Sequence, residues 1–154
     1  MAENNNNILT MVITQNEKVT DPGEESPTAS VIIELFPDIA PNHVKQIKTL
    51  VSEEFYDGII FHRVIEGFMA QTGDPTGTGM GGSDLPDIRA EFTSTPFERG
   101  TLGMARSQHP DSANSQFFIC FQEASFLNNQ YTVFGRVKEG MEFILSLIHI
   151  SEPT

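Results

Sequence analysis

Residues 61–71 read Phe-His-Arg-Val-Ile-Glu-Gly-Phe-Met-Ala-Gln, the most informative stretch of this 154-residue chain. Its first half is a short apolar run typical of a β-strand, and it carries one cation, Arg63. Because strand side chains alternate between two faces, Arg63 shares a face with Phe61 and Ile65, where a core side chain is usual. Burial of a guanidinium at such a position costs free energy unless a hydrogen-bond acceptor pairs with it or a ligand binds to it. The alternative is an edge-strand arginine with its stem buried and its head in solvent.

The second half of this stretch supplies three different groups within four residues. Phe68 gives a flat ring, Met69 a soft thioether and Gln71 an uncharged group that can donate and accept hydrogen bonds. This set suits a small apolar ring flanked by peptide groups better than it suits a charged ligand. The pattern therefore indicates a site for an apolar group within a polypeptide.

Two later segments extend the pattern. Residues 100–121 read GTLGMARSQHPDSANSQFFICF, and residues 126–138 read FLNNQYTVFGRVK. The chain thus contains Phe-His-Arg with Gly-Phe-Met-x-Gln, then Gly-x-x-x-Met-Ala, Ser-Gln-Phe-Phe-Ile and Val-Phe-Gly-x-Val. In this order and spacing the segments resemble the cyclophilin family of peptidyl-prolyl cis–trans isomerases over most of residues 30–143. The Met-Ala-Arg-Ser-Gln-x-Pro form and the absence of tryptophan are more similar to bacterial members than to animal ones.

The pattern of the chain predicts a mainly β fold. Strands are expected at residues 8–14, 31–36, 100–105, 116–121 and 131–137, besides the one that carries Arg63. Pro41 suits the first position of a helix whose apolar stripe is Val44, Ile47, Leu50 and Val51. Residues 15–30 and 72–96 read as loops. The resemblance implies a closed antiparallel barrel capped by two helices, the second starting near Lys138.

The resemblance also implies the reaction, which is rotation about an X–Pro peptide bond. Amide resonance sets its barrier at about 18–20 kcal/mol. Rotation localises a lone pair on the prolyl nitrogen, so a fixed donor aimed at that atom acts more strongly in the transition state than in the ground state. Arg63 is the expected donor, because it stays protonated. Gln71 matches the residue that hydrogen-bonds the substrate backbone and orients the arginine. No cofactor, nucleophile or metal is required.

The remaining site residues follow from the resemblance position by position. Those expected to bind substrate are Phe68, Met69, Ala105, Arg106, Gln116, Phe118, Phe126, Leu127 and Tyr131. Phe68, Met69, Phe118 and Leu127 match the pocket for the proline ring, Ala105 and the Arg106 backbone match the rim that pairs with an extended peptide, and Gln116 matches a groove residue.

The chain departs from the family at several of these positions. Arg106 stands where Asn is frequent, Phe126 where many eukaryotic members have Trp, and Tyr131 where His is common. One additional residue lies within 106–114 relative to animal members. Cyclosporin is therefore expected to bind weakly, because Phe126 has no indole N–H to donate.

Two other hypotheses about function are consistent with parts of the sequence. A proline-peptide binding module or chaperone with little turnover could carry the same pocket. The enzyme is favoured by the joint presence of Arg63, Phe68, Met69, Gln71 and Phe118. Residues 77–82 read GTGMGG and match the dinucleotide-binding pattern G-x-G-x-x-G. That motif requires a strand before it and a helix after it, and Pro75 with the following Ser-Asp-Leu-Pro argues against both.

Several ionisable or reactive side chains are better explained by a structural role than by a catalytic or metal-binding one. His43 is expected on the helix surface, His62 as a satisfied structural histidine and His109 in a loop, none with metal-ligand spacing. Solvated loop charges are expected at Asp74, Asp84, Asp87 and Glu91. The lone Cys120 lies in an apolar run and is expected to be a buried, inert thiol.

The composition limits which binding partners and which cellular compartment are expected for the protein. The 21 acidic and 9 basic residues give a net charge of −12, which argues against nucleic acid and anionic membranes as partners. A single cysteine is consistent with a reducing compartment. The expected protein is a cytoplasmic monomer whose partners are proline-containing peptides and unfolded proteins.

The expected boundaries are a disordered leader over 1–7, an isomerase domain over 8–144, and a tail over 145–154. The tail reads LSLIHISEPT and matches the translation of a sequencing adapter. We therefore expect the last strand of the barrel to be missing through C-terminal truncation. A read of the source locus that continues unchanged through Thr154 would contradict this hypothesis.

Overall fold

The computed structural model describes residues 2–5, 7–14 and 28–148. The strands are β1 (Ala2–Asn5), β2 (Ile8–Thr14), β3 (Thr28–Leu35), β4 (Arg63–Ile65), β5 (Met69–Thr72), β6 (Thr101–Met104), β7 (Phe117–Cys120) and β8 (Val133–Glu139). The helices are α1 (Pro41–Ser52) and α2 (Met141–Leu145), with a 3₁₀ turn η1 at Ser125–Leu127. The predicted strands and both predicted helices are present. Most of the predicted 15–30 loop and the end of the tail lie outside the described residues.

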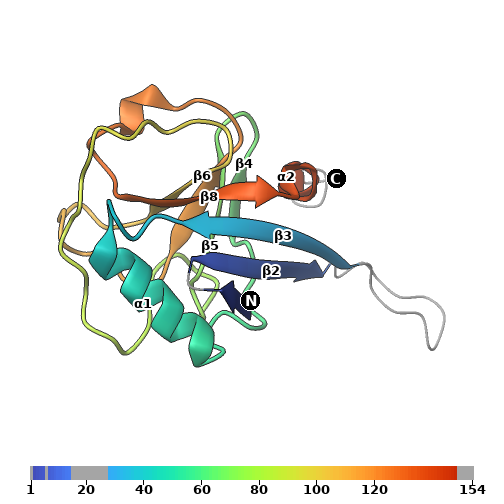
Figure 1. Ribbon diagram of the computed structural model, residues 1–154, viewed down its shortest axis with the longest axis horizontal. Coiled ribbons are helices and arrows are strands. Elements are labelled where there is room, and N and C mark those ends of the chain that lie inside the picture. Colours follow the sequence, from blue (N-terminus) through green and yellow to red (C-terminus); the bar gives the residue numbers. More distant parts are fainter. Residues whose placement is uncertain (1, 6, 15–27, 149–154) are drawn as a thin grey trace.

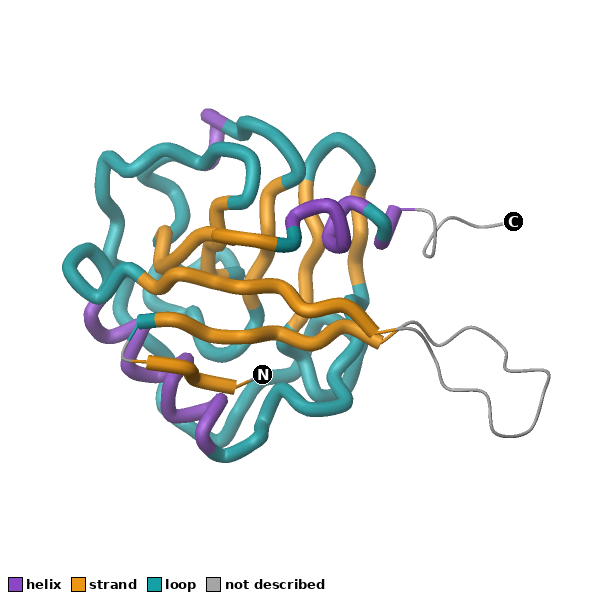
Figure 2. Tube along the Cα trace, turned by 45° about the vertical axis from the view of Figure 1, so that its right-hand side comes forward, coloured by secondary structure: helices purple, strands orange, loops and turns teal. Residues whose placement is uncertain are grey.

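The described strands form one antiparallel sheet in the order β1-β2-β3-β8-β6-β7-β5-β4. Figures 1 and 2 show it as a curled surface, with α1 beside the β1 edge and α2 directly after β8. The prediction of a closed barrel is wrong. Closure requires the two edge strands to pair, but within the described residues β1 pairs with β2 and β4 with β5 alone. Helix α1 packs beside β1, so a helix rather than a strand lies next to that edge.

The N-terminal residues differ from the prediction. Ala2–Asn5 pair with β2 as strand β1 instead of forming part of a disordered leader over 1–7. The pairing is explained by the edge of β2, which offers backbone donors and acceptors that an extended segment can satisfy. At the other end, α2 continues the chain after β8, and Ile144 and Leu147 are buried. Residues 149–154 lie outside the description, so the adapter hypothesis stays a prediction.

Helix α1 forms as its sequence predicts. Pro41 occupies its first turn, and Val44, Ile47, Leu50 and Val51 are all buried. Its N-terminus is capped from outside the helix: the Glu91 carboxylate accepts hydrogen bonds from the backbone N–H groups of Asn42 and His43, at 3.3 and 2.9 Å. A carboxylate at this end satisfies unpaired N–H groups and complements the helix dipole.

The predictions for His43 and Glu91 are therefore wrong. His43 is fully buried, with Nδ1 2.5 Å from Glu91 Oε1, and Nε2 has no partner among the described residues. Burial lowers the pKa of His43, and the nearby Glu91 carboxylate opposes that shift only in part. Glu91 is a structural carboxylate rather than a solvated one. The helical spacing of the apolar stripe did not reveal this, since Glu91 is brought to α1 from a distant loop.

The two faces of the sheet carry separate apolar cores. One contains the buried face of α1 together with Ala70, Phe117 and Ile119. The other contains Met69, Phe118 and Cys120, the alternate residues of the same strands. Phe117 and Phe118, which are adjacent in the sequence, thus lie in different cores on opposite faces of the sheet. Cys120 is buried as predicted, and burial raises the pKa of its thiol to about 12.

Candidate functional site

A row of directly opposed residues crosses the sheet on the face of the second core. Arg63 on β4 pairs with Gln71 on β5, Gln71 pairs with Phe118 on β7, Phe118 with Gly103 on β6, and Gly103 with Val133 on β8. Directly opposed residues in antiparallel strands project their side chains to the same face. The register therefore places a cation, an amide and an apolar ring side by side, although they come from segments far apart in the sequence.

An apolar cluster forms the middle of this face. Met69, Phe118, Leu127 and Val133 are buried in it. Phe68, Ala105 and Tyr131 are partly buried and pack against it. The sequence-predicted pocket residues thus gather at one place. Partly exposed apolar groups over a buried floor are suited to receive a small apolar ring.

The floor of the cluster is built from stacked rings. The Phe118 ring stacks on Phe97 at a centroid distance of 5.7 Å and meets Tyr131 edge-on at 5.7 Å. Both phenylalanines press on Gly103, where a Cβ would lie 2.5 Å from Phe118 Cζ and 2.6 Å from Phe97 Cε1. Any larger residue at 103 would displace the rings. Sequence reasoning missed Phe97 because it stands outside the recognised motifs, in a segment that reads as a loop.

A chain of amide hydrogen bonds runs from the cluster to the neighbouring loop. Gln71 Nε2 donates to Gln116 Oε1 at 2.8 Å, and Gln116 Nε2 donates to the carbonyl oxygens of Gly79 and Gly81 at 3.0 and 2.8 Å. A hollow of about 500 Å³ lies along this chain, and Ala105 contributes to its wall. The Gln71 side-chain amide is consequently held at one orientation beside the hollow.

Asp74 organises the glycine-rich loop that carries these carbonyls. Its carboxylate accepts hydrogen bonds from the Thr76 N–H and hydroxyl at 2.8 and 2.7 Å, and from the N–H groups of Thr78 and Gly79 at 3.1 and 2.6 Å. Only 1% of Asp74 is exposed, so the prediction of a solvated loop charge is wrong. Burial alone would raise the pKa of Asp74, but the hydrogen bonds, chiefly from Thr76, hold it well below its usual range. The N–H groups of this loop bind a carboxylate of the protein itself, which argues against the interpretation of residues 77–82 as a dinucleotide-binding loop.

Arg63 itself is exposed on β4. Among the residues that the structure describes, no carboxylate pairs with its guanidinium and no acceptor receives its side-chain N–H groups. The adjacent His62 was expected to be satisfied, but its buried Nδ1 lacks a partner within the described ranges. Burial lowers the pKa of His62, with the Asp74 charge opposing this shift and the Arg63 charge adding to it. The donors of Arg63 are thus available to a bound molecule.

Arg106, by contrast, is fully engaged within the protein. Its Nε and Nη2 donate to the Gln130 carbonyl oxygen at 3.0 and 2.6 Å, and Nη1 donates to the Ser107 carbonyl at 2.9 Å. The guanidinium lies 4.7 Å from the centre of the Tyr131 ring and 5.8 Å from that of Phe92. Its side chain supports the pocket wall, while its backbone follows Ala105 along the hollow. The contact with Phe92 was not predicted.

Phe126 is largely exposed, with 70% of its surface accessible to solvent. It is joined to the cluster through Phe68, whose ring centre lies 5.5 Å away. It therefore extends the apolar surface outward rather than forming part of the floor.

Metal and membrane sites receive no support from the part of the chain that is described. No group of three or more His, Cys, Asp or Glu side chains there could hold a metal ion. Among the same residues, no helix is long and apolar enough to span a membrane.

Comparison with known proteins decides the family. The model of the cyclophilin type peptidyl-prolyl cis-trans isomerase/CLD family matches residues 24–152. This chain belongs to the cyclophilin family. The match includes every segment on which the resemblance rests, together with all strands from β3 onward.

Curated cyclophilins of bacteria and fungi are similar in sequence. A probable peptidyl-prolyl cis-trans isomerase of Brucella suis biovar 1 (strain 1330) is 57% identical over 125 residues, which are 74% of this chain and 64% of that protein. A peptidyl-prolyl cis-trans isomerase-like 1 of Aspergillus oryzae is 41% identical over 131 residues, 81% of this chain and 80% of that protein. The chain spans 64% of the length of the Brucella relatives.

A solved cyclophilin shares the fold. The crystal structure of a cyclophilin type peptidyl-prolyl cis-trans isomerase from Cryptosporidium parvum, in the presence of the dipeptide Ala-Pro, superposes with a TM-score of 0.73. The two sequences are 34% identical, and the match covers 82% of each chain.

Proposed function

We propose that this chain is a peptidyl-prolyl cis–trans isomerase that accelerates rotation of X–Pro bonds in peptides and folding proteins. The observation that carries the proposal is the row in which three features stand side by side: an exposed arginine that has no partner among the described residues, a held amide and an apolar pocket. Membership of the cyclophilin family supports it, as does the Ala-Pro dipeptide named with the Cryptosporidium relative.

The chemistry follows from what each part does. The proline ring enters the apolar pocket of Phe68, Met69, Phe118 and Leu127, and its burial fixes one side of the X–Pro bond. Arg63 donates to the prolyl nitrogen as the amide twists and the lone pair localises there. Because this hydrogen bond is stronger in the twisted state than in the planar one, it lowers the barrier rather than only improving binding. No bond is made or broken.

The substrate backbone is held along the neighbouring hollow. Gln71 is oriented by Gln116 and is opposite Arg63 in register, so it can hydrogen-bond a substrate peptide group on the same face. Ala105 and the backbone of Arg106 line the hollow and provide an edge for an extended peptide. Holding the chain on one side of the bond while the other side turns is the positioning part of catalysis.

The test is a protease-coupled isomerisation assay on a short X–Pro peptide with Arg63→Ala. Removal of one preorganised donor is expected to lower kcat/KM by about 10²–10³, with an unchanged circular dichroism spectrum. Arg99→Ala, an exposed arginine outside this face, is the matched control and should keep wild-type activity. Arg63→Ala turning over at the wild-type rate would reject the mechanism.

The binding-module alternative makes a different prediction. Such a protein would bind X–Pro peptides with little turnover, and Arg63→Ala would change affinity without changing any rate. The Arg63 donors, which no acceptor within the described ranges receives, favour the enzyme, because a purely apolar pocket would bind proline without them.

Weak cyclosporin binding belongs to the same proposal. The exposed Phe126 offers a ring but no N–H donor, so Phe126→Trp should bind cyclosporin more tightly and retain isomerase activity. Equal affinities by calorimetry would show that the donor is unimportant here. A cytoplasmic, monomeric protein remains part of the proposal, supported by the single, buried cysteine.

A further inference from the structure

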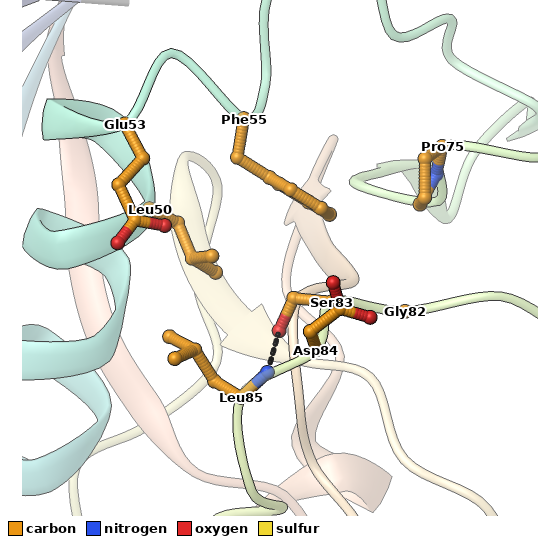
Figure 3. Close-up of a pocket in the computed structure, with 8 residues that line it drawn as sticks. All are labelled: Leu50, Glu53, Phe55, Pro75, Gly82, Ser83, Asp84 and Leu85. Atoms are coloured by element: carbon orange, nitrogen blue, oxygen red, sulfur yellow. Dashed lines mark hydrogen bonds between the residues drawn. The ribbon is translucent and has the colours of Figure 1, made fainter.

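A second hollow, of about 290 Å³, lies between the C-terminal end of α1 and the loop after β5 (Figure 3). Its apolar walls are Leu50 from α1, Phe55, Pro75 and Leu85. None of these residues belongs to the pocket described above. The hollow therefore needs an explanation of its own.

Two carboxylates stand at this hollow. Glu53 follows the last residue of α1, and Asp84 lies in the loop beside Ser83, whose hydroxyl accepts a hydrogen bond from the Leu85 N–H at 3.2 Å. Figure 3 shows the Phe55 ring reaching into the space above Ser83 and Asp84, with Glu53 on the helix side. Glu53 and Asp84 are both exposed, and no basic side chain of the described residues pairs with either.

The end of α1 adds to the negative potential. The helix dipole places partial negative charge at a C-terminus, where basic side chains usually compensate it. The last turn of α1 contains no basic residue, and Glu53 adds a full negative charge at that position. The two carboxylates and the C-terminal end of α1 therefore all make the electrostatic potential at the hollow more negative.

We propose that this hollow binds a basic side chain of a polypeptide partner. The aliphatic stem of an arginine or lysine would pack against Leu50 and Leu85, and the cationic head would lie by the Phe55 ring between Glu53 and Asp84. Aromatic faces and carboxylates are the two groups that a guanidinium prefers. The net charge of −12 attracts cationic segments to the protein as a whole.

The location gives this site a use beyond prolyl isomerisation. Gly82 and Ser83 line both this hollow and the 500 Å³ hollow beside Gln71. A client could thus place a basic residue here while another part of its chain lies in the catalytic groove. Clients with basic residues near proline would gain a second contact, which short neutral peptides do not have.

The experiment is a nuclear magnetic resonance titration of the ¹⁵N-labelled full chain with N-acetyl-arginine amide. Its neutral isostere, N-acetyl-citrulline amide, is the matched ligand. We expect the arginine probe to shift the backbone amide signals of Gly82, Ser83 and Leu85 in a saturable way. The citrulline probe should bind several-fold more weakly, since it keeps the shape but lacks the charge.

The variants separate this site from general attraction to an acidic protein. Glu53→Gln with Asp84→Asn should weaken arginine binding about five- to tenfold, the loss expected for two exposed ion pairs of about 0.5–0.7 kcal/mol each. Glu54→Gln removes one negative charge beside Glu53 but outside the hollow, and should leave affinity within a factor of two. Equal shifts with both probes, shifts elsewhere, or equal losses in the two variants would overturn the proposal.

Isomerase activity on a neutral X–Pro peptide is measured in the same samples. The double variant should retain it, because neither carboxylate is part of the catalytic row. A wild-type protein without isomerase activity would reject the proposed function and leave the titration result standing.

Discussion

Substitution of Gly103 by alanine tests how tightly the proline pocket is built. The new methyl group would lie 2.5 Å from Phe118 Cζ and 2.6 Å from Phe97 Cε1. Carbon atoms in contact normally lie about 3.5–4.0 Å apart, so the rings would have to move by about 1 Å. Overpacking of this kind typically costs about 1–3 kcal/mol. For a domain of this size that lowers Tm by about 2–4 °C for each kcal/mol.

In Gly103→Ala, kcat/KM should be affected more strongly than Tm, because Phe118 forms the floor of the proposed proline pocket. A displacement of about 1 Å at a reacting site can lower the rate about 10²-fold. Protease-coupled kcat/KM and thermal melts would be measured for Gly103→Ala, for Phe97→Leu and for the double variant. Since leucine removes the edge of the Phe97 ring, the double variant should regain part of the activity. If Gly103→Ala matches the wild type in Tm and kcat/KM, the described packing of the floor is wrong.

Two further predictions concern buried titratable groups. The folded-state pKa of His43 lies below its usual value of 6.5, so the unfolded chain takes up more protons as the pH falls. The free energy of unfolding should therefore decline as the pH falls from about 6.5 through that lower pKa. His43→Gln should flatten this decline, and equal slopes for the two proteins in urea titrations at several pH values would contradict it. Asp74→Asn should destabilise the glycine-rich loop by about 1.5–3 kcal/mol, the value of a hydrogen bond to a charged group, and should raise KM through the Gln116 contacts; an unchanged unfolding midpoint in urea would argue against this role.

Much of the fold could be read from the sequence because its signals are local. The helical stripe that begins at Val44 predicts which side chains of α1 are buried, and the structure agrees. The position of the site residues was predicted from the resemblance rather than from periodicity. Their register across the sheet is what explains why Arg63 and Phe118 stand on one face.

The errors concern polar groups whose partners cannot be recognised from local sequence patterns. Glu91 looks like a loop charge in the sequence because its partners, Asn42 and His43 at the N-terminus of α1, are 49 and 48 residues away. Asp74 reads as solvated because a glycine-rich sequence does not reveal that its backbone N–H groups will converge on one carboxylate. Barrel closure failed for a related reason, since pairing of edge strands is decided by tertiary geometry rather than by strand propensity.

The row from Arg63 to Val133 also has a kinetic consequence. Apart from the β4–β5 hairpin, its members come from strands that are neighbours in space but distant along the chain. The hydrogen bond between Gln71 and Gln116, beside the β5–β7 pairing, spans 45 residues. Strand β8, which begins with Val133, is itself bound to β3 by the Arg136–Glu34 ion pair across 102 residues. Closing such long loops is slow, so non-local strand pairing delays folding. The arginine and the proline pocket therefore come together only after the late, long-range steps of folding. Recovery of isomerase activity after dilution from denaturant should then lag behind the recovery of helical signal from α1, whose contacts are local.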